Sequence, residues 1–521
     1  MKEDPEDRAR ETHERDSESH VDSPRREFMR NAGLAAAAFM VVPRHVLGGS
    51  GYVAPSDTVN IAGIGVGGVG RGNLAALSSQ NLVALCDVDW GYVDARYGEI
   101  PVQIREMSES LDEIETSEEK EQVRIEIANL RRLQDKAPQA ARYTDYRELL
   151  EKQKDIDAVV IATPDHTHAV IALAAMDLGV HVYLQKPLAW SIEECRLLAE
   201  RAAQTKVVTQ MGNQGRSSDD ARLVNQYIAD GAIGTVTEVH AWTNRPLAYW
   251  PQGIPRPAAS TTPAEDLKWD MNGVMQRLAA ALGSYSPPDS LAWDLFLGPA
   301  PHVDYHPIYH PFNWRGWVDW GVGAIGDMGA HLIDHAWWAL DLGYPTSVET
   351  HSTPYNRQSY PMSTITYYEF PRKGSRPPVR LTWYDGGLLP PAPDELAGAT
   401  LSPDGGVLYV GSKGRLLHDT YGSNPRLLPQ ALHDATPKPK LRYERITTSH
   451  EMNWIEAIRG KAAATSPFES AAPLTEVMLL GIAALNAGRK IQYDARNMRI
   501  TNVDDSDAIL KRRYRKGWEL A

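Results

Sequence analysis

The stretch TVNIAGIGVGGVGRGNLAALSSQNLVALCDVD, residues 58–89, decides the fold of this chain. Its first apolar run, 59–64, has the length of a buried parallel strand. Gly65, Gly67 and Gly70 then form G-x-G-x-x-G, whose glycines allow a tight turn, a close approach to a pyrophosphate and close packing of the next helix. That helix would direct its N-terminal amides at the phosphates.

A second apolar run, 82–86, ends in Asp87, which follows Gly65 by 22 residues. A carboxylate near this spacing binds the ribose hydroxyls of a dinucleotide. A glycine-rich turn alone is a weak signal. Here strand, turn, helix, strand and acid occur in the right order, which favours a dinucleotide site over a merely tight turn. Because a carboxylate at Asp87 repels a 2′-phosphate, the sequence favours NAD over NADP.

Length and charge narrow the class of protein. A chain of 521 residues with 42% apolar residues is long enough for two domains with extra segments. Its net charge of −13 argues against nucleic acid and anionic membrane surfaces as partners. The 14 Trp and 22 Tyr against 6 Phe suit sugar-binding clefts or ordinary interfaces, and composition does not decide between them. Cys86 and Cys195 fall in a predicted strand and helix, so we expect buried thiols rather than a disulfide or a metal pair.

The N-terminal segment resembles an export signal. Residues 1–22 are charged and polar and are expected to be disordered. Arg25 and Arg26 precede a weakly apolar run over 32–42, a pattern that is typical of twin-arginine signals and too short for a stable membrane anchor. The alternative is an Arg-rich patch before a small buried helix. We assign 1–57 to a signal and linker; no A-x-A site follows the apolar run there, so cleavage stays open.

Strands and helices alternate between residues 58 and 212. Apolar strands are expected at 158–162, 180–184 and 207–211, and the alternation predicts a doubly wound parallel sheet, that is, a Rossmann domain. A charged insert over about 91–141 has helical spacing and is expected to form a helical hairpin on the flank. Functional residues should follow the carboxyl ends of the strands, where the sequence places Asp87, Thr163, Lys186 and Asn213.

The pattern changes after residue 212. Residues 213–500 mix helices with alternating strands, which predicts an α+β domain built on a large, open, mostly antiparallel sheet. The expected strands lie at 237–242, 347–350, 363–369, 379–384 and 406–410. Residues 501–521 are expected to form a C-terminal tail. The predicted fold class is therefore α/β, with a Rossmann domain followed by this second domain.

The segment GAIGDMGAHLIDHAWWAL, residues 323–340, holds the candidate acid–base groups. Asp327 and His331 are four residues apart and so share one helix face. A carboxylate beside an imidazole can orient the ring for general acid–base catalysis. A capping Asp and a packed His have the same spacing, and spacing alone favours that alternative. Lys186 precedes a proline at a strand end, where an ammonium can stabilise an oxyanion; by itself it is more often a surface lysine.

No metal site is expected from the histidines. His302, His306 and His310 are spaced by four, but Pro307 and Pro311 make this stretch a loop rather than a helix. The three imidazoles therefore do not share a helix face. We expect them to be structural residues or part of a substrate loop.

Taken together, these motifs resemble the Gfo/Idh/MocA oxidoreductases, the family of glucose–fructose oxidoreductase and inositol dehydrogenase. The resemblance covers about 59–499 and rests on the glycine fingerprint, T-P-D-H-T-H, Q-K-P and G-D-M-G-A-H-L-I-D. The segments M-G-N-Q-G, T-N-R-P, W-P-Q-G, W-D-L-F-L-G-P-A-P, F-N-W-R-G-W and G-R-K-I-Q-Y-D resemble its exported bacterial branch. The resemblance implies a Rossmann domain and an open-sheet domain, NAD(P)-linked chemistry on sugars or cyclitols, and a homo-oligomer formed through the sheet.

The resemblance also implies roles for individual residues. Lys186 matches the lysine of the family's E-K-P motif, and Asp327 and His331 match its D-x-x-x-H pair, so these three are the expected catalytic residues. Cofactor contacts are expected from Gly65, Gly67, Gly68, Gly70, Asp87, Thr163, Pro164, His168, Gln185, Lys186 and Asn213. Substrate contacts are expected from Gln214, Arg245, Trp314, Arg315, Asp327 and His331.

Gln185 departs from the family pattern, which has Glu at this position. The change removes a negative charge beside Lys186 and so affects both the pKa of the lysine and the contact with the nicotinamide. The inserts at 91–141 and 256–288 also depart from compact members of the family.

These features predict an NAD-dependent oxidoreductase that acts on a carbohydrate. His331 would take a hydroxyl proton, Asp327 would orient it, and Lys186 would stabilise the oxyanion while hydride goes to the nicotinamide. Two alternatives stay open: a redox-neutral glycosidase, lyase or epimerase that works through a transient keto-sugar, and a binding protein without chemistry. Because NAD is scarce outside the cytoplasm, export to the periplasm by the twin-arginine machinery predicts a cofactor that is loaded first, retained and regenerated in place.

Overall fold

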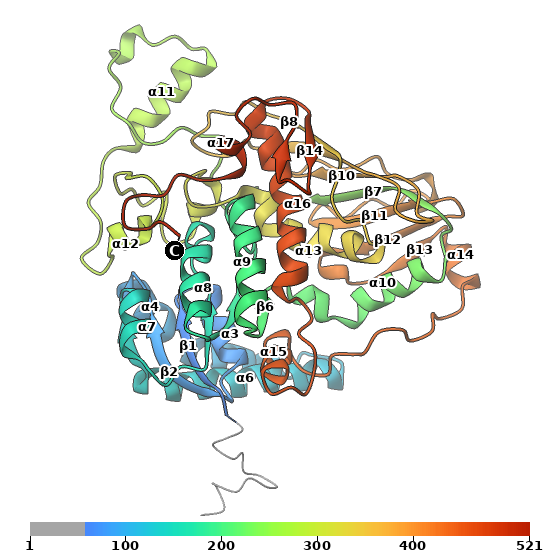
Figure 1. Cartoon of the computed structure of the whole chain (residues 1–521), viewed down its shortest axis with the longest axis horizontal. Helices are drawn as coiled ribbons and strands as arrows, with labels where there is room; N and C mark the ends of the chain where they lie inside the picture. The colour runs from blue at the N-terminus through green and yellow to red at the C-terminus, as the bar shows by residue number, and fades with distance from the viewer. Residues whose placement is uncertain (1–57, 521) are drawn as a thin grey trace, which may run out of the picture. The chain divides into compact units, whose positions relative to one another are not determined.

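The computed structural model describes residues 58–520, in which helices pack on and between two β-sheets (Figure 1). The predicted signal segment, 1–57, lies outside the described residues. The first sheet has six parallel strands in the order β3-β2-β1-β4-β5-β6. They are β1 (Asn60–Ile64), β2 (Asn81–Cys86), β3 (Ala141–Tyr143), β4 (Ala158–Ile161), β5 (His181–Leu184) and β6 (Thr209–Met211). This order confirms the predicted Rossmann arrangement.

Apolar runs and helix caps explain the first sheet. β1 and β4 are buried almost throughout, as strands covered on both faces must be. The covering helices include α3 (Val69–Ala76), α7 (Tyr146–Lys152), α8 (His168–Asp177) and α9 (Ile192–Thr205). α9 begins at a capping box, in which the Ser191 hydroxyl and the Glu194 carboxylate each accept the other residue's backbone N–H. Cys86 and Cys195 are both buried free thiols, as expected.

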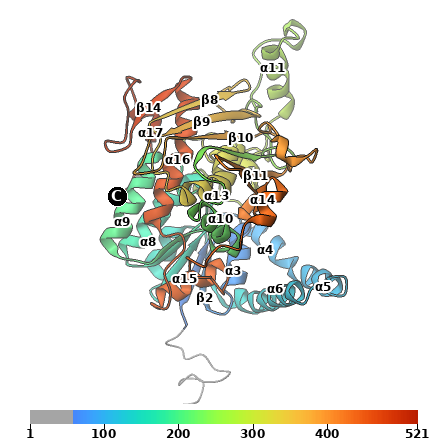
Figure 2. The same cartoon turned by 90° about the vertical axis from the view of Figure 1, so that its right-hand side faces the viewer.

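The insert between β2 and β3 holds three helices rather than the expected two. They are α4 (Trp90–Gly98), α5 (Ile100–Ser110) and α6 (Ser117–Lys136). α6 buries Leu130 and Leu133 in the core around α3, and α5 packs against α6. Figure 2 shows α5 and α6 reaching out to one side of the first sheet. The insert is therefore anchored by one apolar stripe and exposes its charged face, as the helical spacing predicted.

The second sheet has nine strands in the order β13-β12-β11-β7-β10-β9-β8-β14-β15. They are β7 (Val236–Thr243), β8 (Ser347–Ser352), β9 (Thr364–Phe370), β10 (Val379–Tyr384), β11 (Gly405–Gly411), β12 (Arg415–Asp419), β13 (Arg426–Leu428), β14 (Ile491–Asp494) and β15 (Arg499–Ile500). Of the pairs that the structure describes, β7 with β10 is parallel and the others are antiparallel. The predicted large, mostly antiparallel sheet is confirmed, although the strand pattern had not indicated β12 to β15.

Three helices pack on one face of the second sheet. Of these, α13 (Gly323–Ala339) and α16 (Phe468–Ala487) contact the strands directly, and α10 (Asp219–Ala229) packs against α13. α16 contacts β8 and α13 on one side and α9 of the first sheet on the other, so it joins the two halves of the fold. α16 is long and apolar enough to span a membrane, but 78% of its most apolar window is buried in the protein. Its hydropathy is therefore explained by its place in the core.

The chain returns to the first sheet after the second one. α15 (His450–Ile458) buries Trp454 and Ile455 in the core of the Rossmann domain. Beyond α17 (Asp507–Leu510), the Tyr514 hydroxyl donates to the Glu194 carboxylate at 2.9 Å, and Trp518 is buried. The segment expected to be a simple tail is thus packed onto the N-terminal half.

The remaining helices belong to the long segments that connect the main strands and helices. They are α11 (Met271–Leu282), α12 (Trp293–Leu297) and α14 (Gln430–Ala435). Figures 1 and 2 show α11, within the insert at 256–288, projecting from the body of the fold. Trp269 beside it is 82% exposed.

The far face of the second sheet is only partly open. A loop between β10 and β11 packs Leu396 and Leu401 on Trp242, and the Trp242 indole N–H donates to the Ser402 carbonyl at 2.8 Å. The rest of this face carries charged pairs, including Arg380 with Glu369. The open part of this face is therefore polar, and the β10–β11 loop covers the rest.

Candidate active site

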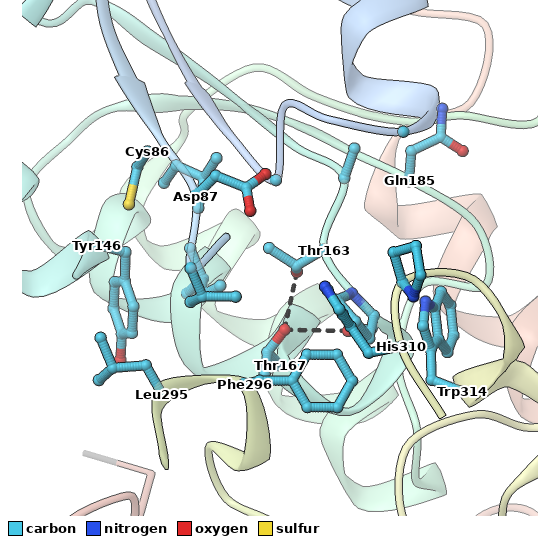
Figure 3. Close-up of a pocket in the computed structure, with 18 of the residues that line it drawn as sticks. Cys86, Asp87, Tyr146, Thr163, Thr167, Gln185, Leu295, Phe296, His310 and Trp314 are labelled. Atoms are coloured by element: carbon cyan, nitrogen blue, oxygen red, sulfur yellow. Dashed lines mark hydrogen bonds between the residues drawn. The ribbon is translucent and has the colours of Figure 1, made fainter. Parts of the chain in front are cut away.

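A cavity lies at the carboxyl ends of β1, β2, β4 and β5, where a doubly wound sheet holds its ligand. Figure 3 shows Asp87 and Thr163 on one side, facing Phe296, His310 and Trp314 from a later segment. We call one end the Asp87 end, lined by Asp87, Tyr146, Leu295, Phe296, His310 and Trp518. We call the other the Lys186 end, lined by Gln185, Lys186, Arg315 and Asp327.

The glycine turn after β1 has the shape of a phosphate cradle. Gly65 has a φ of +80°, and a Cβ there would lie 2.7 Å from the Ala162 backbone. A Cβ on Gly70 would lie 2.1 Å from the Gly65 carbonyl oxygen, so the helix can follow the turn closely only with glycine. Gly68 lines the cavity, and a Cβ there would meet nothing within 4 Å. This open space beside the backbone amides at the start of α3 fits a pyrophosphate.

Asp87 lies where the fingerprint predicted and has an additional role. Its carboxylate accepts the backbone N–H of Val66 at 2.8 Å and of Gly67 at 3.2 Å. Burial raises the pKa of Asp87, although these hydrogen bonds oppose the shift. The carboxylate therefore ties the glycine turn to the end of β2 while it still lines the cavity.

A loop from the second half of the chain covers the Asp87 end. Asp89 accepts hydrogen bonds from the Ser290 hydroxyl and pairs with His310 Nε2, both at 2.8 Å. The backbone N–H of Ala292 donates to the Val88 carbonyl at 2.8 Å. Sequence reasoning had treated His310 as a structural or substrate-loop residue and had not connected it to the cofactor. Nothing in the local sequence links it to Asp89, because their contact is made only when the loop folds over β2.

Asp327 is the centre of charge at the Lys186 end. Lys186 Nζ donates to its carboxylate at 2.6 Å and to its carbonyl at 3.0 Å. Arg315 Nε lies 3.4 Å and Arg245 Nε 3.6 Å from the same carboxylate. Burial would raise the pKa of Asp327, but Lys186 and Arg315 hold it well below its ordinary range. Burial lowers the pKa of Lys186, and the Asp327 charge opposes that shift.

His331 lies one helical turn beyond Asp327, as expected, but it is not held by that carboxylate. The Asp327 carboxylate is bound to Lys186, and within residues 58–520 His331 Nδ1 has no hydrogen-bond partner. The imidazole is 2% exposed and packs edge-on against Tyr421, with ring centroids 4.8 Å apart. Burial, and secondly the Lys186 charge, lower the pKa of His331 well below its ordinary value. The imidazole is therefore neutral at neutral pH, and burial and the Lys186 charge both oppose its protonation.

Asp165 belongs to the site although the sequence analysis did not select it. It lies within T-P-D-H-T-H, and its carboxylate is 3.3 Å from Arg315 Nη1 and accepts the Val322 N–H at 3.2 Å. Burial raises the pKa of Asp165 to about 6, against the influence of Arg315 and Lys186. The pair holds the Arg315 guanidinium over the start of α13. The available sequence signal was an acid four residues after the end of β4.

Seven expected contact residues lie outside the cavity lining: Gly67, Gly70, His168, Asn213, Gln214, Arg245 and His331. His168 is fully buried, and its ring nitrogens bridge the Pro187 and Thr163 carbonyls at 2.8 and 2.9 Å. Asn213 is buried and donates to Asp334 at 2.9 Å, while Gln214 is exposed. Of the other expected residues, Gly65, Gly68, Asp87, Thr163, Pro164, Gln185, Lys186, Trp314, Arg315 and Asp327 line the cavity.

Aromatic rings lie beside the two arginines that pair with Asp327. The Arg245 guanidinium lies over Tyr249, 3.3 Å from the ring centroid. Trp250 packs edge-on against Phe312, which is 50% exposed and lines the cavity. Tyr249 and Tyr421 are also exposed by more than a third. Such rings suit the apolar faces of a sugar.

No metal centre accompanies these groups: across residues 58–520, no cluster of three or more His, Cys, Asp or Glu could hold a metal ion. His306, one of the three spaced histidines, contacts the Leu282 carbonyl through Nε2 at 3.0 Å.

Two family descriptions match the chain. One reads "Oxidoreductase family, NAD-binding Rossmann fold" and matches residues 59–213. The other reads "Oxidoreductase family, C-terminal alpha/beta domain" and matches residues 258–368. The first match spans the glycine turn, Asp87 and Lys186, and the second spans Arg315, Asp327 and His331.

Relatives and solved structures agree with this fold. A glycosyl hydrolase family 109 protein of Shewanella pealeana is 28% identical over 231 residues, 40% of this chain and 43% of that protein. Levoglucosan dehydrogenase of Pseudarthrobacter phenanthrenivorans is 33% identical over 114 residues, 20% of this chain and 29% of that protein. The matches thus span less than half the length of these curated relatives. The WlbA dehydrogenase of Bordetella pertussis, solved with NADH and UDP-GlcNAcA, is 16% identical, with a TM-score of 0.51 over 84% of this chain and 99% of that one; this likeness concerns the fold alone.

Proposed function

This chain belongs to the Gfo/Idh/MocA family of NAD-binding oxidoreductases, and we propose that it removes hydride from a secondary alcohol carbon of a sugar, cyclitol or glycoside. The observation that carries the proposal is that one cavity combines a dinucleotide cradle at its Asp87 end with a Lys186–Asp327 pair at its Lys186 end. The aromatic rings beside Asp327 support a carbohydrate as the substrate.

NAD, when bound, supplies a hydride acceptor at nicotinamide C4. The Lys186 ammonium donates to the substrate oxygen and stabilises the negative charge that develops there. His331 accepts the hydroxyl proton, so the C–H electron pair leaves as hydride, the proton goes to the imidazole and a C=O bond remains. Asp327 keeps Lys186 charged and fixed in direction, and Arg315 and Asp165 hold Asp327 in place.

The cover over the Asp87 end supports a retained cofactor. Asp89 binds Ser290 and His310, and the loop that carries them would have to part from β2 before a dinucleotide could leave. An exported enzyme would need such retention, and Arg25 and Arg26 are the reason to propose export to the periplasm by the twin-arginine machinery. Export that continues after both arginines are changed to lysine would refute this localisation.

A retained cofactor also fits a second function. If hydride returns to the same substrate after elimination or epimerisation, the enzyme is a redox-neutral glycosidase, lyase or epimerase that needs no exchange of NAD. The covered Asp87 end and the match to a glycosyl hydrolase family 109 protein favour this alternative over simple turnover with free NAD. A binding protein without chemistry is the third alternative, and the Lys186–Asp327 pair argues against it.

One experiment separates these functions. The full chain is purified, the cofactor that it carries is released and identified, and the loaded protein is incubated with a panel of sugars and glycosides. Stoichiometric NADH formation that then stops indicates oxidation that needs a second substrate. Sustained product formation without added NAD indicates the redox-neutral function. Bound NAD(H) with no turnover on any compound indicates a binding protein, and no affinity for NAD(H) contradicts the proposal altogether.

Self-association through the second sheet is a further part of the proposal. It rests on the family and on the part of the sheet face that the β10–β11 loop leaves uncovered, where Arg380 pairs with Glu369. Light scattering at micromolar concentration tests it, and a monomer would count against it.

A further inference from the structure

Gln185, the residue that departs from the family pattern, is part of a buried chain of three polar side chains. It is 7% exposed and lines the Lys186 end of the cavity. Its amide Nε2 donates to Asn73 Oδ1 at 2.9 Å, and Asn73 Nδ2 donates to Glu451 Oε1 at 2.9 Å. Asn73 comes from α3 and Glu451 from α15, so three distant segments meet here.

The hydrogen bonds that link Gln185, Asn73 and Glu451 have a fixed direction, because the last of these side chains is a carboxylate. Glu451 can only accept a hydrogen bond, so Asn73 must turn its NH₂ group toward Glu451 and its oxygen toward position 185. Position 185 must therefore donate, which an amide can do and an ionised carboxylate cannot. Gly212 lies against the Gln185 amide, and a Cβ there would be 2.6 Å from Nε2, so the amide has little room to move.

The Gln185 oxygen is then left as an acceptor near the reacting groups. Its one hydrogen bond within the described residues is a long one, 3.3 Å from the Lys186 backbone N–H. Under the proposed function the glycine turn takes the pyrophosphate and Asp87 the ribose, so the nicotinamide falls toward Gln185 and Lys186. The oxidised nicotinamide ring carries a positive charge, and the reduced ring is neutral.

We propose that Glu451 and Asn73 hold a neutral Gln185 at the nicotinamide end, and that this neutrality favours NADH over NAD⁺ relative to a carboxylate at the same position. The inference rests on the proposed function. A buried carboxylate would attract the oxidised ring more than the reduced one, because an interaction between close charges in a site with little water is strong. Gln185 would thus make the bound cofactor a better hydride acceptor and hold the hydride for longer. It acts as a positioning and tuning residue rather than a catalytic one.

The test compares the two redox forms of the cofactor in the full-length protein after its own nucleotide has been removed. NAD⁺ and NADH are titrated separately by calorimetry, and the ratio of Kd for NADH to Kd for NAD⁺ is compared between parent and variants. Gln185→Glu is expected to raise this ratio about tenfold, equivalent to a fall of about 30 mV for a two-electron couple. Gln185→Met is the matched neutral control: both affinities should fall, and the ratio should stay within about twofold of the parent.

A second pair of variants tests the direction of the hydrogen bonds between Gln185, Asn73 and Glu451. Gln185→Glu is expected to lower the melting temperature, because its carboxylate meets the Asn73 oxygen. Glu451→Gln lets Asn73 turn around, so the double variant should melt closer to the parent than Gln185→Glu alone does. The double variant also provides a folded protein for the titrations if Gln185→Glu is unstable, and its ratio should show the same rise.

Three results would overturn the inference. A ratio that does not change in either variant with Glu at position 185 shows that the residue does not sense the charge of the nicotinamide. Equal stability of the single and double variants shows that Glu451 does not set the direction of the hydrogen bonds through Asn73 to Gln185. A parent protein that binds neither nucleotide refutes the proposed function and this inference with it, whereas a parent that binds both with an insensitive ratio refutes the inference alone.

Discussion

The two ends of the cavity are built in opposite ways. At the Asp87 end, the glycine turn and Asp87 come from one continuous stretch, the strand, turn, helix and strand over 59–89, and a distant loop that carries Leu295, Phe296 and His310 closes over them. The Lys186 end has no such local unit: Lys186, Arg245 and Asp327 come from three well-separated segments. The dinucleotide-binding residues are thus encoded within one short stretch of sequence. The charged groups at the Lys186 end come together only when distant segments pack against one another.

The largest effect should come from His331, one helical turn beyond Asp327 on α13. His331→Ala should lower kcat by about 10²–10⁴-fold, since it removes the base, while affinity for NAD stays within a few-fold. Steady-state kinetics on a verified substrate and a NAD titration measure the two quantities.

His335→Ala is the matched control, because His335 is also buried, lies one turn further from Asp327 along α13 and packs against His418. It should lower stability but change kcat only a few-fold. A His331→Ala protein with nearly parental kcat would show that the base lies elsewhere, and Lys186 would be the first residue to examine.

Asp87 should control the choice between NAD and NADP at the other end. Asp87→Asn keeps an acceptor for the Val66 and Gly67 amides but removes the charge that repels a 2′-phosphate. The ratio of NADP to NAD affinity should rise about 10- to 100-fold, with little effect on kcat for the loaded enzyme. Asp89→Asn, a loss of charge two residues away, should leave the ratio unchanged. An Asp87→Asn protein that still rejects NADP would mean that another group discriminates.

The cover over the Asp87 end should govern how fast the cofactor leaves. His310→Ala removes the ring that pairs with Asp89 and should raise the dissociation rate of NADH about tenfold, since loss of one buried hydrogen bond to a charged group costs about 1.5–3 kcal/mol. Stopped-flow release of prebound NADH measures the rate. His306→Ala alters the same loop without touching the cavity and should release NADH at the parental rate. Equal rates in both variants would mean that the loop does not retain the cofactor.

The smallest effect concerns pH and Asp165. Burial raises its pKa in the folded protein to about 6, above the ordinary value of 3.8, so the folded state holds this proton more tightly than the unfolded state does. The contribution of protonated Asp165 to the free energy of unfolding is therefore complete below pH 3.8 and is lost as pH rises through 6. Asp165→Asn should reduce the fall in unfolding free energy between pH 4 and pH 7 by about 1 kcal/mol, as measured by urea denaturation.

Asp385 provides the comparison for that measurement. Burial also raises its pKa to about 6, but it is bound to Thr364 and Trp383 in the second sheet, far along the chain from Lys186. Asp385→Asn should change the pH slope of stability similarly and leave kcat unaltered. If neither substitution changes the pH dependence of the unfolding free energy, burial does not raise the pKa of these two carboxyl groups in solution.

Particular residues show how far sequence reasoning reached. The Rossmann strands, the glycine turn and Asp87 follow from apolar runs and turn chemistry that act within about 30 residues, and all are confirmed in the fold. Lys186 and Asp327 were selected by motif, and the structure brings them together at 2.6 Å. The catalytic roles given to Lys186, Asp327 and His331 stay predictions.

Other residues show where sequence reasoning stopped. Asp165 was not selected, and His310 was interpreted as a structural or substrate-loop residue and not linked to the cofactor. His168 and Asn213 were expected at the cofactor but are buried outside the cavity lining. Apart from the Thr163 carbonyl beside His168, the partners of these residues are 19 to 221 residues away in the chain. No local periodicity encodes such a contact.

The sequence by itself determined the fold class and the kind of cofactor, because strand and helix periods, glycine turns and the charge at Asp87 act over short stretches of chain. Only the tertiary structure decided which charges pair. Asp327 binds Lys186 rather than His331, and Gln185 is oriented by Glu451 through Asn73. The physical reason is that hydrogen bonds and ion pairs in a buried site depend on separations of a few ångströms. Those separations exist only after the two sheets and the returning helix α15 have packed together.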